Sequence, residues 1–439
     1  MTDKKILYVV HCVDTEGPLN ETLGATFDRL ESIFGIVLAP TKENLKRLQK
    51  KELNLAGKEE AVAKCFAPEL LSYNKNWSDI NLMLDELLSS GFRNQKLDDF
   101  GGGWVYSWHC MDHIGYFDNP RQKDVGYGNI FRFYKSKLLE SASLQDEINW
   151  HFHPLSLTRN PLNAATSFVN SYDILSQILC RRILEDKWFP VVNRPGFHAE
   201  RPDSHAFLEQ WIPFDYANQS YVEEVDQPDL SYGRFGDWSR ASTSWRGYQP
   251  HHDDYQLSGQ CRRHIFRCLN VGTRFRALNK NHVREAFEEA DIKGSAILAF
   301  ADHDYRDMRK DVINVMLFLE ELKIKYPNVK IQYSGAEAAA TSLLGFEKKP
   351  NLILSHHFEL NRFIVEVSNG QIFGPQPFLA IKTKEGRYFH DNLDVVEPWK
   401  KWSYVLDAQT INLKDIKKIG VAAAGKYGGF SISVHGEVN

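Results

Sequence analysis

The sequence of 439 residues lacks both a secretory signal and any clustered cysteine pattern. Its cysteines are Cys12, Cys65, Cys110, Cys180, Cys261 and Cys268. None of them forms a C-x-x-C pair, which argues against a zinc ribbon and against a framework of disulfides. The apolar run Ile6–Val10 is too short for the core of a signal peptide. These absences predict a cytoplasmic protein with reduced thiols.

Long apolar runs and a strong net charge are also missing. No apolar segment reaches the length of a transmembrane helix, so no membrane span is expected. Lysine and arginine number 53 against 57 aspartates and glutamates, a formal net charge of −4. This balance argues against nucleic acid and anionic membrane surfaces as partners. P-loop and dinucleotide fingerprints are absent, so no nucleotide cofactor is implied.

Aromatic residues, in contrast, are plentiful at 13% of the chain. Aromatic rings pack in cores, and some stack on sugar rings in carbohydrate sites. With 43% hydrophobic and 25% charged residues, the composition is that of a soluble globular protein. The length suits two or three domains.

Strand-like apolar runs alternate with segments of helical spacing as far as residue 345. Expected strands are 4–14, 101–108, 148–153, 189–193, 214–217, 264–269, 297–301 and 329–333. Expected helices are 42–54, 76–91, 171–186, 203–211, 281–290 and 312–325, and residues 114–130 suggest a long loop. This alternation predicts an α/β fold with a mostly parallel sheet or barrel.

From about residue 347 the pattern changes to short strands separated by turn residues. They are 362–367, 378–382, 402–406, 418–423 and 430–434, a spacing typical of a small β-sandwich. The predicted organisation is therefore a barrel-like unit over residues 1–345, with a large insertion at about 19–100. A β-sandwich-like unit follows over residues 346–439.

Polar clusters follow three of the expected strands. Asp14 and Glu16 are separated by one residue, as are His151 and His153. On an extended chain this spacing points both side chains of a pair to the same face. A carboxylate with two histidines is a common open site for Zn²⁺ or another divalent metal. In α/β folds such residues collect at the carboxyl ends of strands, where His303 also lies.

The order of these motifs resembles the NodB-homology polysaccharide deacetylases, also called carbohydrate esterase family four. The motifs are Asp14–Pro18, Asp146–Pro154, Arg194–Phe197, Phe214–Asn218, Asp237-Trp238 and Leu298–Asp304. The resemblance covers roughly residues 5–340. The family usually has adjacent aspartates and a three-residue gap between its histidines, whereas a single residue separates each pair here. The resemblance implies a distorted (β/α) barrel and metal-dependent removal of an N-acetyl group from an amino sugar.

The resemblance also implies a role for each matching residue. Asp14 would be the general base, and Arg194 would pair with it. Glu16, His151 and His153 would hold the metal, with Zn²⁺ the expected ion. His303 would be the general acid that protonates the leaving amine.

Further polar residues are candidates for the same pocket. Asp304 or Asp237 would orient His303, in the way that carboxylates hold catalytic imidazoles. Asp112 and His113 follow the strand expected at 101–108 and so are expected to reach the same face. Trp238, next to Asp237, is a candidate for a sugar platform.

Three functions are compatible with these residues. The leading hypothesis is deacetylation of an amino sugar in a glycan or, given the cytoplasmic expectation, in a precursor for surface polysaccharide. The second is another metal-dependent amidohydrolase acting on a different C–N bond. The third is a glycan-binding homologue without catalysis, which the shortened histidine spacing favours. All three leave the oligomeric state open.

Overall fold

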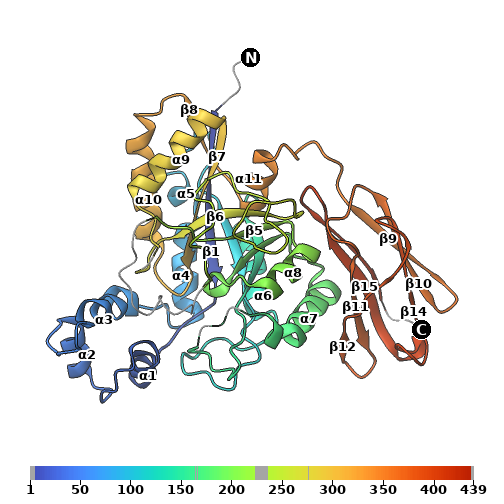
Figure 1. Cartoon of the computed structure of the whole chain (residues 1–439), viewed down its shortest axis with the longest axis horizontal. Coiled ribbons are helices and arrows are strands. Elements are labelled where there is room, and N and C mark those ends of the chain that lie inside the picture. The colour runs from blue at the N-terminus through green and yellow to red at the C-terminus, as the bar shows by residue number, and fades with distance from the viewer. Residues whose placement is uncertain (1–4, 164, 166, 223–235, 275, 437–439) are drawn as a thin grey trace.

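Seven parallel strands close into a barrel at the centre of the molecule (Figure 1). The computed structural model describes residues 5–163, 165, 167–222, 236–274 and 276–436. Around the barrel the strands are β1 (Lys5–Thr15), β2 (Tyr106–Cys110), β3 (Glu147–Phe152), β4 (Val192–Pro195), β5 (Phe214–Asn218), β6 (His264–Asn270) and β7 (Ser295–His303). All neighbouring pairs are parallel, and the pairing of β1 with β2 closes the ring. The expected α/β barrel is confirmed at this level.

β1 is the strand around which the barrel closes. One edge of it pairs with β7 along Ile6–Asp14. The other edge is divided, because β8 (Val329–Tyr333) pairs with Lys5–Val9 and β2 pairs with His11–Thr15. Both faces of β1 are buried and mostly apolar until the strand reaches its carboxyl end. The polar side chains that follow therefore emerge at one end of the barrel.

Helices surround the barrel and lie at its two ends. They are α1 (Leu23–Phe34), α2 (Lys42–Gln49), α3 (Glu59–Cys65), α4 (Trp77–Leu87), α5 (Ser90–Arg93), α6 (Asn129–Glu140), α7 (Tyr172–Arg181), α8 (Pro202–Trp211), α9 (Lys280–Lys293), α10 (Arg309–Lys323) and α11 (Ala336–Leu343). In α9 the Asn279 side chain accepts the first N–H groups, and Gly294 ends the helix in a left-handed conformation, φ 88°. None of the described helices is long and apolar enough to cross a membrane.

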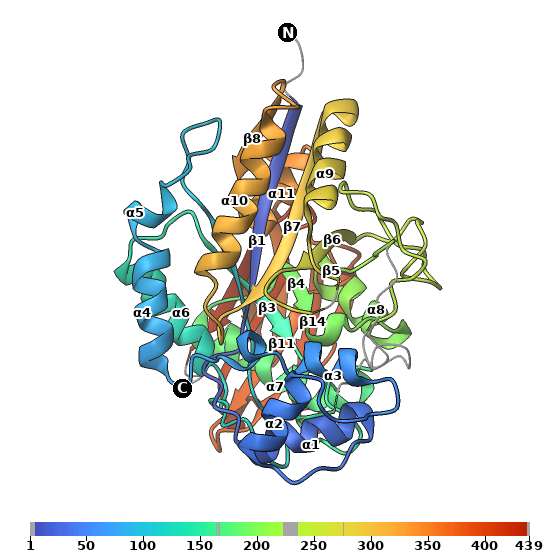
Figure 2. The same cartoon turned by 90° about the vertical axis from the view of Figure 1, so that its left-hand side faces the viewer.

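The insertion between β1 and β2 builds a small helical cap. α1, α2 and α3 share a hydrophobic cluster of their own, which includes Phe27, Leu30 and Val62. Figure 2 shows these helices below the carboxyl end of β1. Since α1 contributes Arg29 and Ile33 to the lining of the main cavity, the cap forms one wall of that cavity at the carboxyl end of the barrel.

The amino end of the barrel is closed by α11. Its buried alanines belong to the same apolar cluster as Val10 and Phe266. The Tyr216 hydroxyl donates to the carbonyl of Ala336 (2.7 Å). At the start of β3, the Glu147 carboxylate accepts the N–H groups of Glu337 (2.8 Å) and Ala338 (3.0 Å). The negative charge of a carboxylate next to the first turn of a helix is favourable, because that end of the helix dipole is positive.

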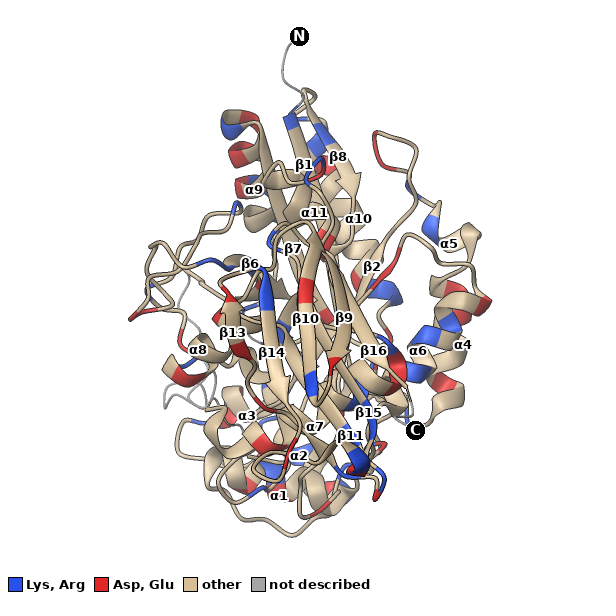
Figure 3. Cartoon of the chain, turned by 90° about the vertical axis from the view of Figure 1, so that its right-hand side faces the viewer, with Lys and Arg blue, Asp and Glu red and all other residues tan. Residues whose placement is uncertain are grey.

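The C-terminal part is a sandwich of two antiparallel sheets. Its strands are β9 (Ile353–Glu359), β10 (Arg362–Asn369), β11 (Phe378–Thr383), β12 (Tyr388–Phe389), β13 (Asp394–Glu397), β14 (Lys401–Val405), β15 (Ile416–Ala424) and β16 (Phe430–His435). Figure 3 looks onto the sheet with the order β13-β14-β10-β9, and the other sheet is β12-β11-β15-β16. The sandwich lies beside α7, where the Gln177 amide donates to the carbonyl of Tyr388 (2.8 Å). The predicted division at residues 345 and 346 lies between α11 and β9.

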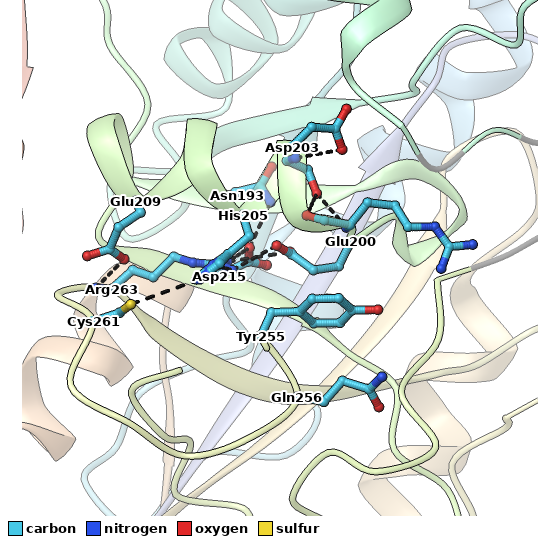
Figure 4. Close-up of polar contacts among 12 residues, drawn as sticks. Asn193, Glu200, Asp203, His205, Glu209, Asp215, Tyr255, Gln256, Cys261 and Arg263 are labelled. Atoms are coloured by element: carbon cyan, nitrogen blue, oxygen red, sulfur yellow. Dashed lines mark hydrogen bonds and ion pairs between the residues drawn. The ribbon is translucent and has the colours of Figure 1, made fainter. Parts of the chain in front are cut away.

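A buried ionic network joins β4, β5 and β6 (Figure 4). The Arg263 guanidinium, with an exposed fraction of 0%, binds Glu200 (2.8 Å), Asp215 (2.8 Å) and the Nδ1 atom of His205 (2.7 Å). Burial raises the pKa of Glu200 to about 8. The Arg263 guanidinium opposes this shift in pKa, because a nearby positive charge favours the ionised carboxylate. Asp215, in the Phe214–Asn218 motif, therefore stabilises the barrel wall.

Candidate metal centre

The strand-end residues of β1, β3, β4 and β7 meet on the floor of a large cavity. The parallel registers bring them together, because Asp14 is opposite His303 and His151 is opposite Arg194. The cavity has a volume of about 880 Å³. Ligand sites commonly occupy 300–1,000 Å³, so this cavity is among the larger ones.

Glu16, His151 and His153 place one ligand atom each within 4.8 Å of one another. The Nε2 atoms of the two histidines are 2.9 Å apart, and His153 Nε2 is 3.4 Å from Glu16 Oε1. His151 Nδ1 donates to the carbonyl of Arg194 (2.6 Å), which leaves a lone pair on its Nε2. That lone pair faces His153, so either a shared proton or a cation bound by both rings satisfies it. The sequence-predicted ligands therefore form a candidate metal-binding triad.

Asp14 lies beside the triad and is held by Arg194. The Arg194 Nε atom is 2.9 Å from Asp14 Oδ1, and the same oxygen is 3.5 Å from His151 Nδ1. Burial alone would lower the pKa of Arg194, but Asp14 raises it above its usual value. The guanidinium also donates to the carbonyl of Tyr216 (3.2 Å), with its side chain fully buried. Arg194 is thus a fixed positive charge behind Asp14.

His303 faces both carboxylates from the end of β7. Its Nε2 atom is 3.7 Å from Asp14 Oδ2 and 4.0 Å from Glu16 Oε1. Burial lowers the pKa of His303 to about 3, although both carboxylates oppose that shift. Its Nδ1 atom has no hydrogen-bond partner among the described residues. The ring is therefore positioned by packing, with Tyr305 at 5.0 Å between ring centroids.

Asp304 holds Glu16 and does not orient His303. Its carboxylate accepts the backbone N–H groups of Glu16 (2.9 Å) and Gly17 (3.0 Å) and the hydroxyl of Tyr134 (2.9 Å). Burial raises the pKa of Asp304 to about 6. The expectation that Asp304 orients the His303 ring is corrected in this way: it fixes the backbone that carries a candidate metal ligand.

His113 and Lys123 contact Glu16 from the loop between β2 and α6. His113 Nε2 donates to the carbonyl of Glu16 (2.8 Å), so this expected pocket residue does reach the site. Lys123 Nζ lies 3.0 Å from Glu16 Oε2 and 4.4 Å from the centroid of Tyr305. Although burial alone would raise the pKa of Glu16, Lys123 and His153 lower it well below its ordinary value. Sequence reasoning could not identify Lys123, because its loop carries no spacing pattern.

Three other expected pocket residues lie elsewhere. Asp112 binds Arg182 (2.7 Å) behind the loop, with its carboxylate buried. Asp237 accepts from Ser239, and Trp238 donates its Nε1–H to the carbonyl of His198 (3.0 Å). The residues that line the cavity include none of the three. Asp112 does not reach the cavity because it forms an ion pair with the buried Arg182. Asp237 and Trp238 do not reach it because their loop packs against the outside of β5 and β6.

Gly196 and the two residues after it shape the wall next to His153. A Cβ atom on Gly196 would lie 2.2 Å from the His153 ring, so a side chain here would force the ring or the backbone to move. Phe197 and His198 adopt left-handed conformations with φ of 55° and 51°. Such strain costs about 1–2 kcal/mol per residue and collects at functional sites. Sequence reasoning missed His198, whose Nδ1 atom lies 3.4 Å from Arg194 Nη1.

The donor set fits a divalent metal. Two imidazoles and one carboxylate with cavity space beside them are the ligands of an open zinc site. Two of the three ligands have an outer partner of the kind that orients a metal ligand: Arg194 for His151, and Lys123 for Glu16. Searches of protein-family models, of curated proteins and of solved structures found no match to this chain.

Proposed function

We propose that the chain is a metal-dependent hydrolase that removes an N-acetyl group from an amino sugar. The convergence of Glu16, His151 and His153 beside the Asp14–Arg194 pair carries this proposal. The resemblance of the motifs to polysaccharide deacetylases supports the reaction and a barrel of that type. The proposed ion is Zn²⁺, because it accepts two imidazoles and one carboxylate with a position left open.

The chain's own residues would divide the work as follows. Glu16, His151 and His153 would hold the ion, which would supply Lewis-acid polarisation and lower the pKa of a bound water. Asp14 Oδ2 accepts the proton of the attacking water. Arg194 keeps Asp14 in place through its 2.9 Å contact with Oδ1, which leaves Oδ2 directed to the cavity. A positioned base of this kind contributes about 10²–10⁴-fold to a rate.

His303 would deliver the proton to the leaving amine. Burial keeps this imidazole neutral near pH 7, so it must gain a proton before it donates one. Asp14 Oδ2 is 3.7 Å from His303 Nε2, closer than Glu16 Oε1 at 4.0 Å. The pair therefore supports transfer of the proton from Asp14 to His303 and then to the nitrogen of the amine.

A second candidate function is glycan binding without catalysis. The ion pair between Lys123 and Glu16 favours it, because a lysine ammonium can neutralise Glu16 in place of a metal. The same floor would also serve another amidohydrolase with a different C–N substrate. Metal content separates the binding protein from the two enzymes, and a substrate panel separates the enzymes.

The test combines metal analysis with an acetate-release assay. We expect about one equivalent of zinc in the wild type, and its loss in His151→Ala and Glu16→Ala. His357→Ala, at an exposed position of the sandwich, is the matched control and should keep the metal. Acetate release from acetylated amino sugars, and none from non-sugar amides, is the expected result. A wild type that takes up no divalent metal after reconstitution would leave only the glycan-binding candidate.

A further inference from the structure

The lining of the cavity carries more cationic side chains than carboxylates. The positively charged lining residues are Arg29, Arg121, Lys123, Arg274 and Arg306, and the carboxylates are Asp14, Glu16 and Asp118. Part of this charge is already paired. Lys123 binds Glu16, and Asp14 binds Arg194 on the floor. The other cationic lining residues are Arg29, Arg121, Arg274 and Arg306.

Two of these arginines share one buried carboxylate. Arg29 Nη2 lies 2.9 Å from Glu21 Oε2, and Arg121 Nε lies 3.1 Å from Glu21 Oε1. The Glu21 side chain is 1% exposed, and the two arginines are 15% and 24% exposed. A single carboxylate for two guanidinium groups leaves one positive charge in excess on this wall.

Arg306 adds a second excess charge near Arg121, because both guanidinium groups lie over the Tyr73 ring, at 5.9 Å and 6.0 Å from its centroid. Arg306 forms no ion pair with a carboxylate of the described residues, and its buried Nε atom has no hydrogen-bond partner there. Its other nitrogens make only long contacts of 3.4 Å, to the carbonyls of Gly272 and Leu70. The guanidinium lies over the rings of Tyr305 (5.0 Å) and Tyr73 (5.9 Å). These rings orient it but do not neutralise it.

Two acidic groups of the described residues that lie near Arg306, Asp302 and Asp311, are poor counter-ions. Burial raises the pKa of Asp302 well above its ordinary value and that of Asp311 to about 6, although Arg306 opposes both shifts. Asp302 instead accepts the backbone N–H of His303 (2.8 Å). Asp307 binds Arg309 (2.8 Å). Arg306 therefore keeps its hydrogen-bonding capacity for a ligand in the cavity.

Arg306 and Arg274 come from neighbouring barrel loops. Arg306 follows β7, and its contact with Gly272 ties it to the loop after β6 that carries Arg274. Both side chains line the cavity. Arg306 is three residues from His303, so their Cα atoms are at most about 10 Å apart. That distance matches a group carried on the reacting sugar or on its neighbour.

From these observations we infer that Arg306, with Arg274, binds an anionic group of the substrate, a phosphate or a carboxylate. Arginine suits both, because its planar fork donates two parallel hydrogen bonds to either anion. The inference rests on the proposed function and narrows its substrate to an acetylated amino sugar that carries a negative charge. Arg121 and Arg29 line the same cavity and add long-range attraction for the same ligand.

The test is calorimetric binding to the zinc-loaded full chain at low ionic strength. The probes are N-acetylglucosamine 1-phosphate, N-acetylmuramic acid and the neutral methyl glycoside of N-acetylglucosamine. We expect the wild type to prefer one of the charged probes, and Arg306→Gln to lower the charged-to-neutral affinity ratio about tenfold or more. Arg306→Lys should retain part of the preference. Arg309→Gln, which removes an exposed charge outside the cavity, should leave the ratio unchanged.

The outcomes separate this inference from the proposed reaction. Equal affinity for charged and neutral probes would overturn the inference, even if acetate is released from the neutral one. A preference that persists in Arg306→Gln would also overturn it, because the metal would then be binding the anion. A preference lost with Arg306 but without any acetate release would support the anion subsite and reject the deacetylase. The phosphate and carboxylate probes identify which anion the subsite takes.

Discussion

At the carboxyl end of the barrel, Asp14 and Glu16 each bind a cation, whereas Glu147 and Glu337 at the amino end bind none among the described residues. Arg194 and Lys123 supply the positive charge at the first end. At the second end Glu147 accepts the N–H groups that begin α11, and Glu337 accepts the N–H of Gly429 from the sandwich. Burial and the neighbouring Glu147 raise the pKa of Glu337 to about 7.

The difference shows how partners decide what two adjacent carboxylates can do. Two buried like charges disfavour ionisation unless cations compensate them. With cations behind them, Asp14 and Glu16 face an open cavity and are suited to metal and proton chemistry. With uncharged N–H donors alone among the described residues, Glu147 and Glu337 join α11 to the barrel and the sandwich. The same residue type thus gives a candidate site at one end and a structural joint at the other.

The largest effect is expected from Asp14→Asn. The amide cannot accept the proton of the attacking water, so acetate release should fall about 10³-fold. Metal content should stay near the wild-type value, because the candidate triad does not include Asp14. Kinetic assays of acetate release together with metal analysis check both parts.

Asp253→Asn is the matched control for this variant, because its side chain is 80% exposed in a loop outside the cavity. It should retain both metal and activity. Undiminished acetate release from Asp14→Asn would show that Asp14 is not the general base. It would also weaken the contrast between the carboxylates at the carboxyl and amino ends of the barrel.

A smaller loss is expected from Gly196→Ala. The new methyl group would overlap the His153 ring and must push it from the triad. We expect zinc affinity to fall about 10–100-fold, the range seen when groups that position a metal ligand are disturbed. Competition titrations with a zinc-binding dye measure the change.

Gly24→Ala in α1 is the control, because the atom nearest to its new methyl group is 3.8 Å away. Its zinc affinity should match the wild type. If Gly196→Ala binds zinc as tightly as Gly24→Ala, His153 is not a ligand and the triad must be revised.

The sequence predicted the strands and their polar ends well, since both follow from local periodicity. The strand expected at 148–153 is β3, and that at 264–269 is β6. At the centre, the one-residue gaps brought His151 and His153 to face each other, as extended backbone requires. The alternation of apolar runs also sufficed to predict an α/β fold with a mostly parallel sheet or barrel.

What the sequence could not supply are contacts between distant segments. Lys123 reaches Glu16 from a loop more than a hundred residues away, and no spacing rule connects them. The helix α6 was not expected, because the glycine- and asparagine-rich loop before it obscured its start. Asp112 was assigned to the pocket from its strand-end position, but Arg182, seventy residues further on, captures it.

A pH dependence is expected at the amino end of the barrel. The pKa of Glu337 is raised from 4.5 to about 7, so the folded state binds more protons than the unfolded state between these values. Stability is therefore lost as the pH rises through that window. Glu337→Gln keeps an acceptor for Gly429 and removes the charge. Its free energy of unfolding at pH 8 should exceed that of the wild type by about 2 kcal/mol, with little difference at pH 4.

Denaturant unfolding at the two pH values measures this difference. Glu385→Gln, in an exposed pair with Arg387 on the sandwich, should show no such window. If Glu337→Gln is no more stable than the wild type at pH 8, Glu337 is ionised without cost, and the contrast with the carboxyl end disappears.

The smallest effect is expected from Tyr134→Phe, which tests Asp304, the carboxylate of the site that most resembles Glu337. Asp304 also accepts backbone N–H groups and has a pKa raised by burial, to about 6. Removing the Tyr134 hydroxyl leaves one Asp304 oxygen with a single N–H partner, which should cost about 1 kcal/mol of stability. Tyr427→Phe, whose hydroxyl bonds Gln371 at the surface, is the control and should be neutral.

Because Asp304 acts on Glu16 only through the backbone, zinc affinity should fall less in Tyr134→Phe than in Gly196→Ala. An equal or larger fall in zinc affinity would mean that the hydrogen bonds of Asp304 to the backbone of Glu16 and Gly17 affect the metal site as strongly as the position of His153 does.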